Sequence, residues 1–233
     1  MQAKKIINYF SKTEIFLWSS SVFLILISFF IFDRENVLTL FASLIGVTSL
    51  IFNAKGNPTG QVLMVFFSIL YGIISYRFSY YGEMITYLGM TMPMAVFALI
   101  SWLKNPYNGN RAEVKVNSIS SKEALGMWIA AGAVTVVFYY ILSFFSTANI
   151  IPSTLSVTTS FIAVYLTFRR SPLFALGYAS NDIILIALWL PISMKDIRYI
   201  SVVVCFAAFL VNDIYGFFSW RKMKKRQTEA VYA

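Results

Sequence analysis

The stretch ALGYASNDIILIALWLP, residues 175–191, places a carboxylic acid in the middle of an apolar run. In a membrane helix Asp182 would lie about ten residues from either end, too deep for its side chain to reach the lipid headgroups. An acid at that depth faces a bundle interior or a water-filled cavity, and functional use is the default hypothesis. The alternative is an internal hydrogen bond that fixes helix packing. Helical spacing puts Tyr178 and Trp189 on the face of Asp182.

A second acid, Asp213, lies near the end of the last apolar segment, where pairing with a neighbouring basic residue is an equally good reading. The remaining binding candidates are polar or aromatic side chains on apolar segments: Asn181, Asn212, Gln61, Ser68, Tyr71, Tyr87 and Thr91. Together these groups suit a flat polar ring that bears a sugar or a positive charge. Aromatic faces would hold the ring by stacking and cation–π contact, and a carboxylate would hold a cation or sugar hydroxyls.

Composition sets the solvent in which this chemistry would take place. The chain is 58% hydrophobic and only 12% charged, whereas a soluble domain is typically about 25% charged. Lipid is therefore the expected solvent. The chain has one cysteine, Cys205, and no histidine, which excludes an intrachain disulfide and removes the commonest general base and metal ligand. We expect no cofactor and no enzyme; a membrane scaffold that transports nothing is the other alternative.

Eight apolar segments are long enough, or nearly so, for the roughly 17–25 residues of a membrane-spanning helix. They cover about 15–32, 37–52, 58–78, 84–103, 124–146, 152–168, 172–190 and 197–220. Pro58 and Pro172 fit the first turn of a helix, where a missing N–H costs nothing. The first segment is read as a retained helix because no small-residue cleavage site follows it.

The basic residues predict the orientation. If both termini are cytoplasmic, fifteen of the nineteen Lys and Arg residues fall on the inside and four on the outside. This bias supports eight spans with both ends inside, and it explains the net charge of +9 without nucleic acid.

The two halves of the chain also resemble each other. NPTGQVLMVFFSILYG aligns with SPLFALGYASNDIILI, and the units close with SWLK (101–104) and SWRK (219–222), at offsets of 114 and 118 residues. Each unit has three helices, so the fifth segment must link them, which predicts a parallel repeat with substrate near the midplane between the halves. The domains are then an N-terminal tail and extra helix (1–36), a first bundle (37–104), a loop and linker helix (105–150), a second bundle (151–222) and a basic tail (223–233).

Other features receive structural readings. Trp18, Trp102 and Trp220 are expected in the interfacial belt. The loop 104–123 is expected to be a connector, in which Ser120 and Glu123 have capping-box spacing. Small residues on two helices, among them Ser156 and Ser160, are expected to let backbones approach closely.

Several strings in residues 37–222 resemble the Pnu family of bacterial vitamin transporters. They are FNAKGNPTGQ, the following YG, the Trp-closed fourth helix, SVTTSFIAVYLTFRRS, ASNDIILIALWLP and NDIYGFFSWRKMKK. The resemblance implies two three-helix bundles joined by a linker helix, similar to the sugar-transporting SWEET fold. It also implies facilitated diffusion, followed by phosphorylation of the cargo in the cytosol. The best-known branch carries nicotinamide riboside, and relatives carry thiamine, riboflavin or deoxynucleosides.

Asp182 matches an acidic position associated with the seventh helix of that family, and Trp189 lies where an aromatic is expected. Familiar members have a Trp-rich stretch just before the acid, where this chain has LFALGYASN. Because of this departure, the resemblance does not identify which vitamin is carried.

We therefore expect an all-α, multi-pass protein of the bacterial inner membrane that imports nicotinamide riboside, with eight spans, two bundles, a linker helix and an extra N-terminal helix. Its partners are a small-molecule substrate and the lipid bilayer, and a homo-oligomer is among the states the sequence allows. Alternating access would use Pro93 and Gly72 as flex points. The alternatives are a sister transporter for the other vitamins or nucleosides, and proton coupling through Asp182.

Overall fold

The computed structural model describes residues 9–77, 81–147 and 149–232, so Lys4 and Lys5 of the predicted inside tail lie outside it. Within these residues, eight helical segments are long and apolar enough to cross a membrane. They are Lys12–Phe32, Val37–Ala54, Thr59–Arg77, Tyr81–Lys104, Ser121–Phe144, Ile150–Phe168, Phe174–Ser193 and Ile197–Ala230. Every predicted segment thus becomes a helix, and an all-α membrane protein with eight spans is confirmed.

The fourth span is composite. It starts as α5 (Tyr81–Ile85), continues as the π-helical segment η1 (Thr86–Thr91) and ends as α6 (Met92–Lys104). Pro93 stands in the first turn of α6, where it has no N–H to donate to the preceding turn. A wider π-helical turn beside a proline is a common way to absorb that loss, and such turns often lie at functional sites.

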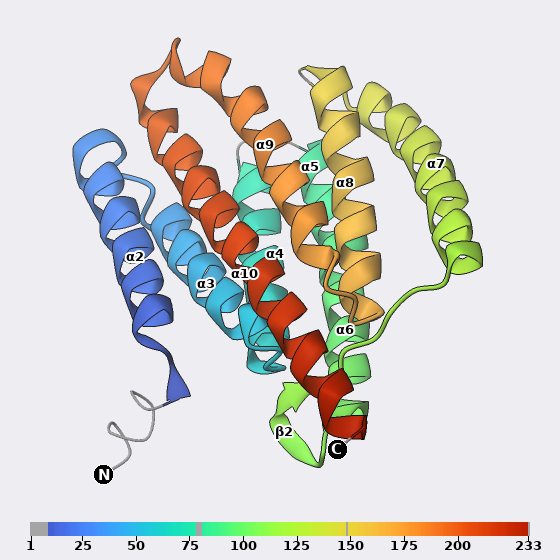
Figure 1. Ribbon diagram of the computed structural model, residues 1–233. Helices are drawn as coiled ribbons and strands as arrows, with labels where there is room; N and C mark the ends of the chain where they lie inside the picture. The colour runs from blue at the N-terminus through green and yellow to red at the C-terminus, as the bar shows by residue number, and fades with distance from the viewer. Residues whose placement is uncertain (1–8, 78–80, 148, 233) are drawn as a thin grey trace.

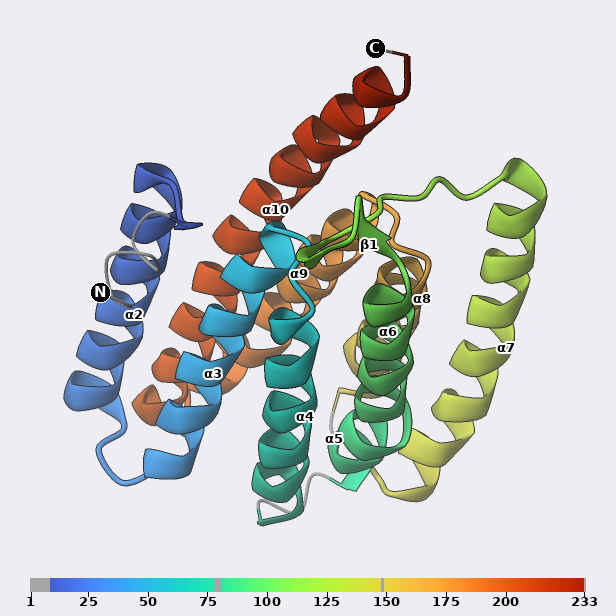
Figure 2. The ribbon, with the colours of Figure 1, turned by 90° about the horizontal axis from the view of Figure 1, so that it is seen from below.

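Six spans form a closed ring in which each helix packs against the next. In order they are α3 (Val37–Ala54), α4 (Thr59–Arg77), α6, α8 (Ile150–Phe168), α9 (Phe174–Ser193) and α10 (Ile200–Tyr232), which returns to α3. Outside the ring, α2 (Lys12–Phe32) packs on α3 and α10, and α7 (Ser121–Phe144) packs on α8. These two helices lie at opposite outer edges of the molecule (Figure 1; Figure 2).

Small residues set the closest contacts in the ring. A Cβ on Gly46 would lie 2.4 Å from Phe209 Cζ, and one on Gly177 would lie 2.9 Å from the Cα of Ala163. Helices α8 and α9 therefore approach backbone to backbone at Gly177, whereas Gly46 of α3 leaves room for the Phe209 ring of α10. Small residues at helix contacts are typical of membrane proteins, because in lipid the hydrophobic effect does not drive helices together and close packing must do so.

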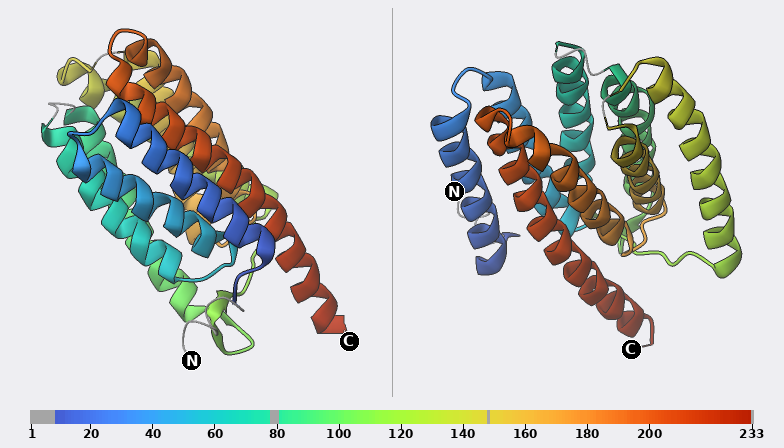
Figure 3. Two further views of the ribbon diagram at one scale, coloured as in Figure 1. Left: turned by 90° about the vertical axis from the view of Figure 1, so that its left-hand side faces the viewer. Right: turned by 90° about the horizontal axis from the view of Figure 1, so that it is seen from above.

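The start of α2, the end of α10 and a β-hairpin lie at one end of the bundle, here called the hairpin end (Figure 1). The hairpin pairs β1 (Pro106–Tyr107) with β2 (Asn110–Val114). The opposite end, here called the far end, carries residues 33–36 and 194–199. At the hairpin end α10 extends past the other helices (Figure 3). There the Gln227 amide donates to the carbonyl of Val114.

The loop after α6 is therefore more than the connector expected from its sequence. Val114 is fully buried, and its N–H donates to the Gly56 carbonyl at 2.9 Å. Asn117 N–H donates to the Arg170 carbonyl, also at 2.9 Å. Half of the predicted capping box forms, because Ser120 accepts from the N–H of Glu123. The Glu123 carboxylate instead pairs with Arg169.

The expected belt position of Trp102 and Trp220 is wrong. Both are 0% exposed and belong to an apolar cluster at the hairpin end, with Val114 and Phe174. An interfacial belt needs a ring that is partly open to lipid and water, as Trp18 is at 39% exposed. The two buried tryptophans instead fill the space inside the ring of helices at the hairpin end.

Candidate functional site

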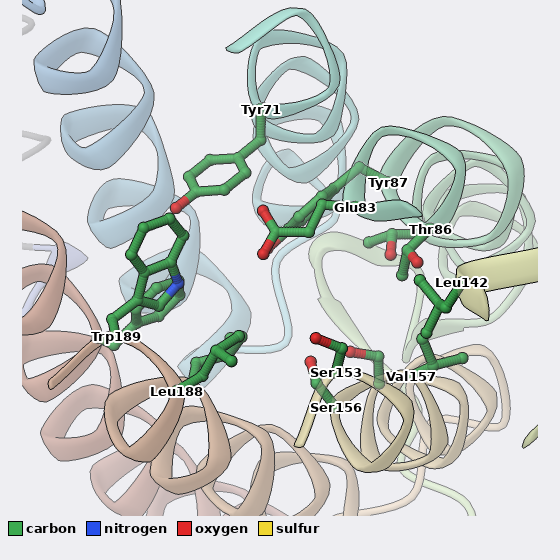
Figure 4. Close-up of a pocket in the computed structure, with 14 residues that line it drawn as sticks. Tyr71, Glu83, Thr86, Tyr87, Leu142, Ser153, Ser156, Val157, Leu188 and Trp189 are labelled. Atoms are coloured by element: carbon green, nitrogen blue, oxygen red, sulfur yellow. The ribbon is translucent and has the colours of Figure 1, made fainter. Parts of the chain in front are cut away.

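A cavity lies inside the ring, between helices of the two halves of the chain (Figure 4). Tyr71 of α4, Glu83 of α5 and Tyr87 of η1 line it from the first half. Ser156 of α8 and Trp189 of α9 line it from the second. The rest of the lining is Thr86, Thr91, Leu142, Ser153, Val157, Ser160, Leu185, Leu188 and Phe206. The lining thus combines aromatic rings, hydroxyls and one carboxylate.

Glu83 supplies the charge. Its carboxylate points into the cavity, with Tyr71 and Trp189 on one side and Ser153 and Ser156 across from it (Figure 4). A carboxylate inside a membrane bundle is costly unless it faces a polar cavity or a partner of opposite charge. Among the residues that line this cavity, none carries a positive charge. The arrangement therefore suits a cationic ligand that enters from outside the protein.

Aromatic rings form the wall beside Glu83. Tyr71 and Tyr87 have ring centroids 4.7 Å apart, and Tyr71 also contacts Phe67 at 5.3 Å. Trp189 packs against Tyr199 with centroids 5.5 Å apart and planes at 31°. Packing of this kind fixes the ring orientations, so that a flat ligand ring can stack without ordering the wall first.

The cavity is small. Its volume is about 30 Å³, whereas pockets for drug-sized ligands have about 300–1,000 Å³. A second hollow of about 30 Å³ shares Tyr71, Glu83 and Trp189 and extends to Asp33 and Tyr199 at the far end. A ligand larger than water can enter only if the helices or the side chains between these hollows move apart.

Four of the predicted site residues line this cavity: Trp189, Tyr71, Tyr87 and Thr91. The other seven have different surroundings, and their role in binding stays a prediction. Three of them hold helices together. Asn181 accepts from Ser156 and Thr159 of α8, each at 3.0 Å. Gln61 donates to Asn53 at 2.8 Å, and Asn212 donates to Ser21 of α2 at 2.9 Å.

Two further candidates have local contacts. Ser68 donates back to the Met64 carbonyl of its own helix at 2.9 Å, and the ring of Tyr178 lies 6.2 Å from that of Phe174. Neither residue lines the cavity.

Asp182 and Asp213 face each other across α9 and α10. Both are 4% exposed, and their two carboxyl groups are close enough to interact electrostatically. The pair lies one helical turn from the cavity residue Leu185, toward the hairpin end. The expectation that Asp213 pairs with a basic residue does not match this contact.

The sequence reading missed Glu83 and the serines of α8. A fourth apolar segment that starts at residue 84 leaves Glu83 in a loop, whereas α5 begins at Tyr81. Ser156 and Ser160 were expected to serve close packing, yet both line the cavity. One signal could have found Glu83: starting the span three residues earlier places it on a helix with Tyr87, one turn away. Among the described residues, no group of three or more His, Cys, Asp or Glu could hold a metal ion.

A ring of membrane-spanning helices with a polar cavity between its halves is the architecture of a small-molecule transporter, and the comparisons with known proteins agree. Residues 36–222 match the family model of the nicotinamide mononucleotide transporters, and the chain belongs to this family. The chain is thus a multi-pass membrane transporter of the PnuC type.

Two curated relatives are nicotinamide riboside transporters named PnuC. The one from Neisseria mucosa is 26% identical over 204 residues, which cover 85% of this chain and 77% of the relative. The one from Haemophilus influenzae is 22% identical over 196 residues and covers 82% of each. The crystal structure of the vitamin B3 transporter PnuC matches the fold with a TM-score of 0.80 at 22% identity, over 94% of both chains.

Proposed function

We propose that this protein imports nicotinamide riboside across the bacterial inner membrane by facilitated diffusion. The observation that carries the proposal is the cavity in which the Glu83 carboxylate stands between Tyr71, Tyr87 and Trp189. Nicotinamide riboside has a flat pyridinium ring with a positive charge and a ribose with free hydroxyls. Relatives over most of the chain are named for this cargo.

Each part of the cargo has a counterpart in the lining. The pyridinium ring would stack on an aromatic face, where cation–π attraction adds to apolar contact. Glu83 would neutralise the charge from the side. Ser153, Ser156 and Ser160 on α8 offer hydroxyls for the ribose across the cavity. The cargo is thus held by side chains from both halves of the chain.

Transport would proceed by alternating access. Residues 37–104 and 151–222 are the two units that move, because the cavity lies between them and is too small for the cargo in the conformation seen here. Rocking one unit against the other would widen the cavity toward one side at a time. The candidate flex points are Pro93 and Gly72. A Cβ on Gly72 would lie 2.6 Å from the side chain of Leu88, so α4 and η1 are in close contact there.

The hairpin end would face the cytoplasm. It carries Lys55, Arg169 and Arg170 and the basic residues that follow Trp220, as the positive-inside rule requires. A uniporter only equilibrates its cargo. Net uptake therefore needs a cytosolic kinase that adds a phosphate, since the anionic phosphate would be repelled by the Glu83 carboxylate and the product would not return through the cavity.

Thiamine is the second candidate cargo, because its cationic thiazolium ring would satisfy Glu83 equally well. Riboflavin and the deoxynucleosides are neutral at the ring and leave the carboxylate without a partner of opposite charge. Proton coupling is the alternative to uniport, and the buried Asp182–Asp213 pair is the observation that favours it.

The test is uptake of labelled nicotinamide riboside into proteoliposomes that contain the purified protein, with no ion gradient imposed. We expect uptake that stops at equal concentrations and is blocked by unlabelled nicotinamide riboside. Stronger inhibition of uptake by thiamine or by a deoxynucleoside than by nicotinamide riboside would assign the protein to a sister branch of the family. Accumulation above equilibrium under an imposed pH gradient would replace uniport by proton coupling.

A further inference from the structure

The two Ser-Trp pairs that close the sequence repeat make the same contacts in the structure. Trp102 Nε1 donates to the Thr167 carbonyl at 2.9 Å, and Ser101 Oγ donates to the Phe168 carbonyl at 2.9 Å. In the other half, Trp220 Nε1 donates to the Asn53 carbonyl at 2.7 Å. Ser219 Oγ donates to the Ala54 carbonyl, also at 2.7 Å.

The accepting carbonyls belong to the last two residues of α8 and of α3. The final carbonyls of a helix lack partners within the helix and must find them elsewhere. Each half of the chain thus caps the first helix of the other half with a Ser-Trp pair from its own last helix. Both sets of bonds cross between the halves, so they must break if the halves separate at the hairpin end.

The two indole rings also meet. Their centroids lie 5.3 Å apart, and Phe174 packs against Trp220 at 4.9 Å. Both tryptophans are 0% exposed. From the far end of α9 toward the hairpin end, the cavity residues Trp189 and Leu185 come first and Asp182 follows. Phe174, at the hairpin end of this helix, lies at the level of the two tryptophans. The indole pair therefore lies between the cavity and the hairpin end.

We propose that Ser101–Trp102 and Ser219–Trp220 form the gate that closes the cargo cavity toward the hairpin end, with each pair latched to the opposite half. This inference rests on the proposed transport function. The hairpin segment supports the same closed arrangement, because Val114 N–H and Asn117 N–H hold the carbonyls of Gly56 and Arg170, just after the two capped helix ends.

Such a gate is specific and still reversible. The latch needs two N–H and two O–H donors to meet four carbonyls. In a partly closed arrangement the Ala54 and Phe168 carbonyls lose the serine donor, which is a cost where water cannot replace it, whereas Asn53 and Thr167 still accept from the N–H of Gly56 and of Arg170. When the halves separate at this end, water can hydrate the same carbonyls. The net cost of opening is then far smaller than the gross strength of the four bonds.

The experiment measures access to the cavity from each side. The single native cysteine, Cys205, is replaced by alanine, and Ser160→Cys on the cavity wall serves as the reporter. A membrane-impermeant methanethiosulfonate is applied to vesicles of known orientation, first from the hairpin end and then from the far end. Trp102→Phe and Trp220→Phe keep an aromatic ring but remove the N–H donor. Trp128→Phe is the matched control, because Trp128 is 59% exposed on α7.

Since labelling from the hairpin end follows the open fraction, we expect each gate variant to raise that rate about tenfold, equivalent to about 1.4 kcal/mol. Labelling from the far end should not rise, and the control should match the parent protein. Unchanged rates from the hairpin end in both variants would overturn the gate. So would equal rises from both ends, because they would indicate a loosened fold.

If a phenylalanine variant does not reach the membrane, Ser101→Ala combined with Ser219→Ala tests the same latch with no change of ring. It should raise labelling from the hairpin end alone, by about threefold to tenfold. Nicotinamide riboside serves as a separate arm. Its failure to protect the reporter would count against the proposed cargo and leave the gate intact, because gate opening is read without any cargo.

Discussion

Replacing Glu83 by glutamine should weaken binding of a cationic cargo while leaving a neutral analogue of the same shape almost unaffected. A pyridinium centred about 4 Å from the carboxylate would gain about 4 kcal/mol at an effective dielectric constant of ~20. Roughly half of this is offset by the water that the cargo and Glu83 lose on binding, which leaves about 2 kcal/mol, or about 30-fold in Kd. The neutral amide keeps the volume and the hydrogen-bonding capacity of the side chain, so it changes the charge alone.

The assay is binding and uptake of nicotinamide riboside beside dihydronicotinamide riboside, which has an uncharged ring. We expect Glu83→Gln to lose about 30-fold for the first and less than about threefold for the second. Asp182→Asn is the matched control. It removes an acid from the same membrane bundle, but one that faces Asp213 rather than the cavity. It should change neither affinity by more than about twofold.

The sequence alone makes the opposite prediction, in which Asp182 is the carboxylate that binds the cargo. An equal loss for the charged and the neutral ligand in Glu83→Gln would refute the electrostatic reasoning. A large, charge-selective loss in Asp182→Asn with none in Glu83→Gln would return the binding role to Asp182.

Three further changes test the wall, the anchor of α2 and the turn after α3. Trp189→Ala should weaken cargo binding by about 5- to 100-fold through lost stacking, whereas Trp189→Phe should stay within about fivefold, as measured by ligand titration. Glu14→Ala should lower the free energy of unfolding by about 2 kcal/mol, because the 4% exposed carboxylate pairs with Lys55 at 3.2 Å; an unchanged melting temperature in detergent would contradict this. Gly56→Ala should cost about 2 kcal/mol, since Gly56 has φ +65° and Met223 lies 3.2 Å from a built Cβ. Gly109→Ala, at φ +76° in open space, should show the backbone strain alone, about 1 kcal/mol in the same melting assay.

Much of the fold could be predicted because membrane solvation constrains it simply. Apolar length gives the spans, while the direction that the basic residues favour stays a prediction. The segment ends were less certain, and the start of the fourth span shows the cost. A span that starts at residue 84 instead of Tyr81 leaves Glu83 outside the membrane.

The candidate site was harder to predict because helical periodicity gives the face of a residue and not its neighbour. Tyr178, Asp182 and Trp189 share one side of α9, but different levels of that side face different neighbours. Trp189 meets the cavity and Asp182 meets Asp213. The same limit applies to Trp102. A tryptophan near a helix end is typical of the interface, and only the contact with Trp220, which is 118 residues away, shows that it is buried.

The two halves of the repeat share backbone geometry more than they share side chains. Gly56 and Arg170, 114 residues apart, both have a positive φ, of 65° and 57°, and each is followed two residues later by a proline. Both turns end a helix with the same carbonyls capped, so equal backbone geometry survives although one position is glycine and the other arginine. Few identities are needed to preserve such a turn.

The cavity, in contrast, is asymmetric. With an offset of 114 to 118 residues, the positions equivalent to Glu83 fall within residues 197–201, IRYIS, which contain no acid. Arg198 of that stretch is paired with Asp196 at 2.7 Å on the surface. A charge on one side of a two-fold arrangement orients a cargo whose own charge lies at one end, with its ring toward the first half and its sugar toward the serines of α8. Moving the acid across the cavity to the second half, by combining Glu83→Gln with Ser156→Glu, should therefore not restore the affinity for nicotinamide riboside. Restoration to within about threefold of the parent Kd would show that the cavity binds the cargo equally well in either orientation.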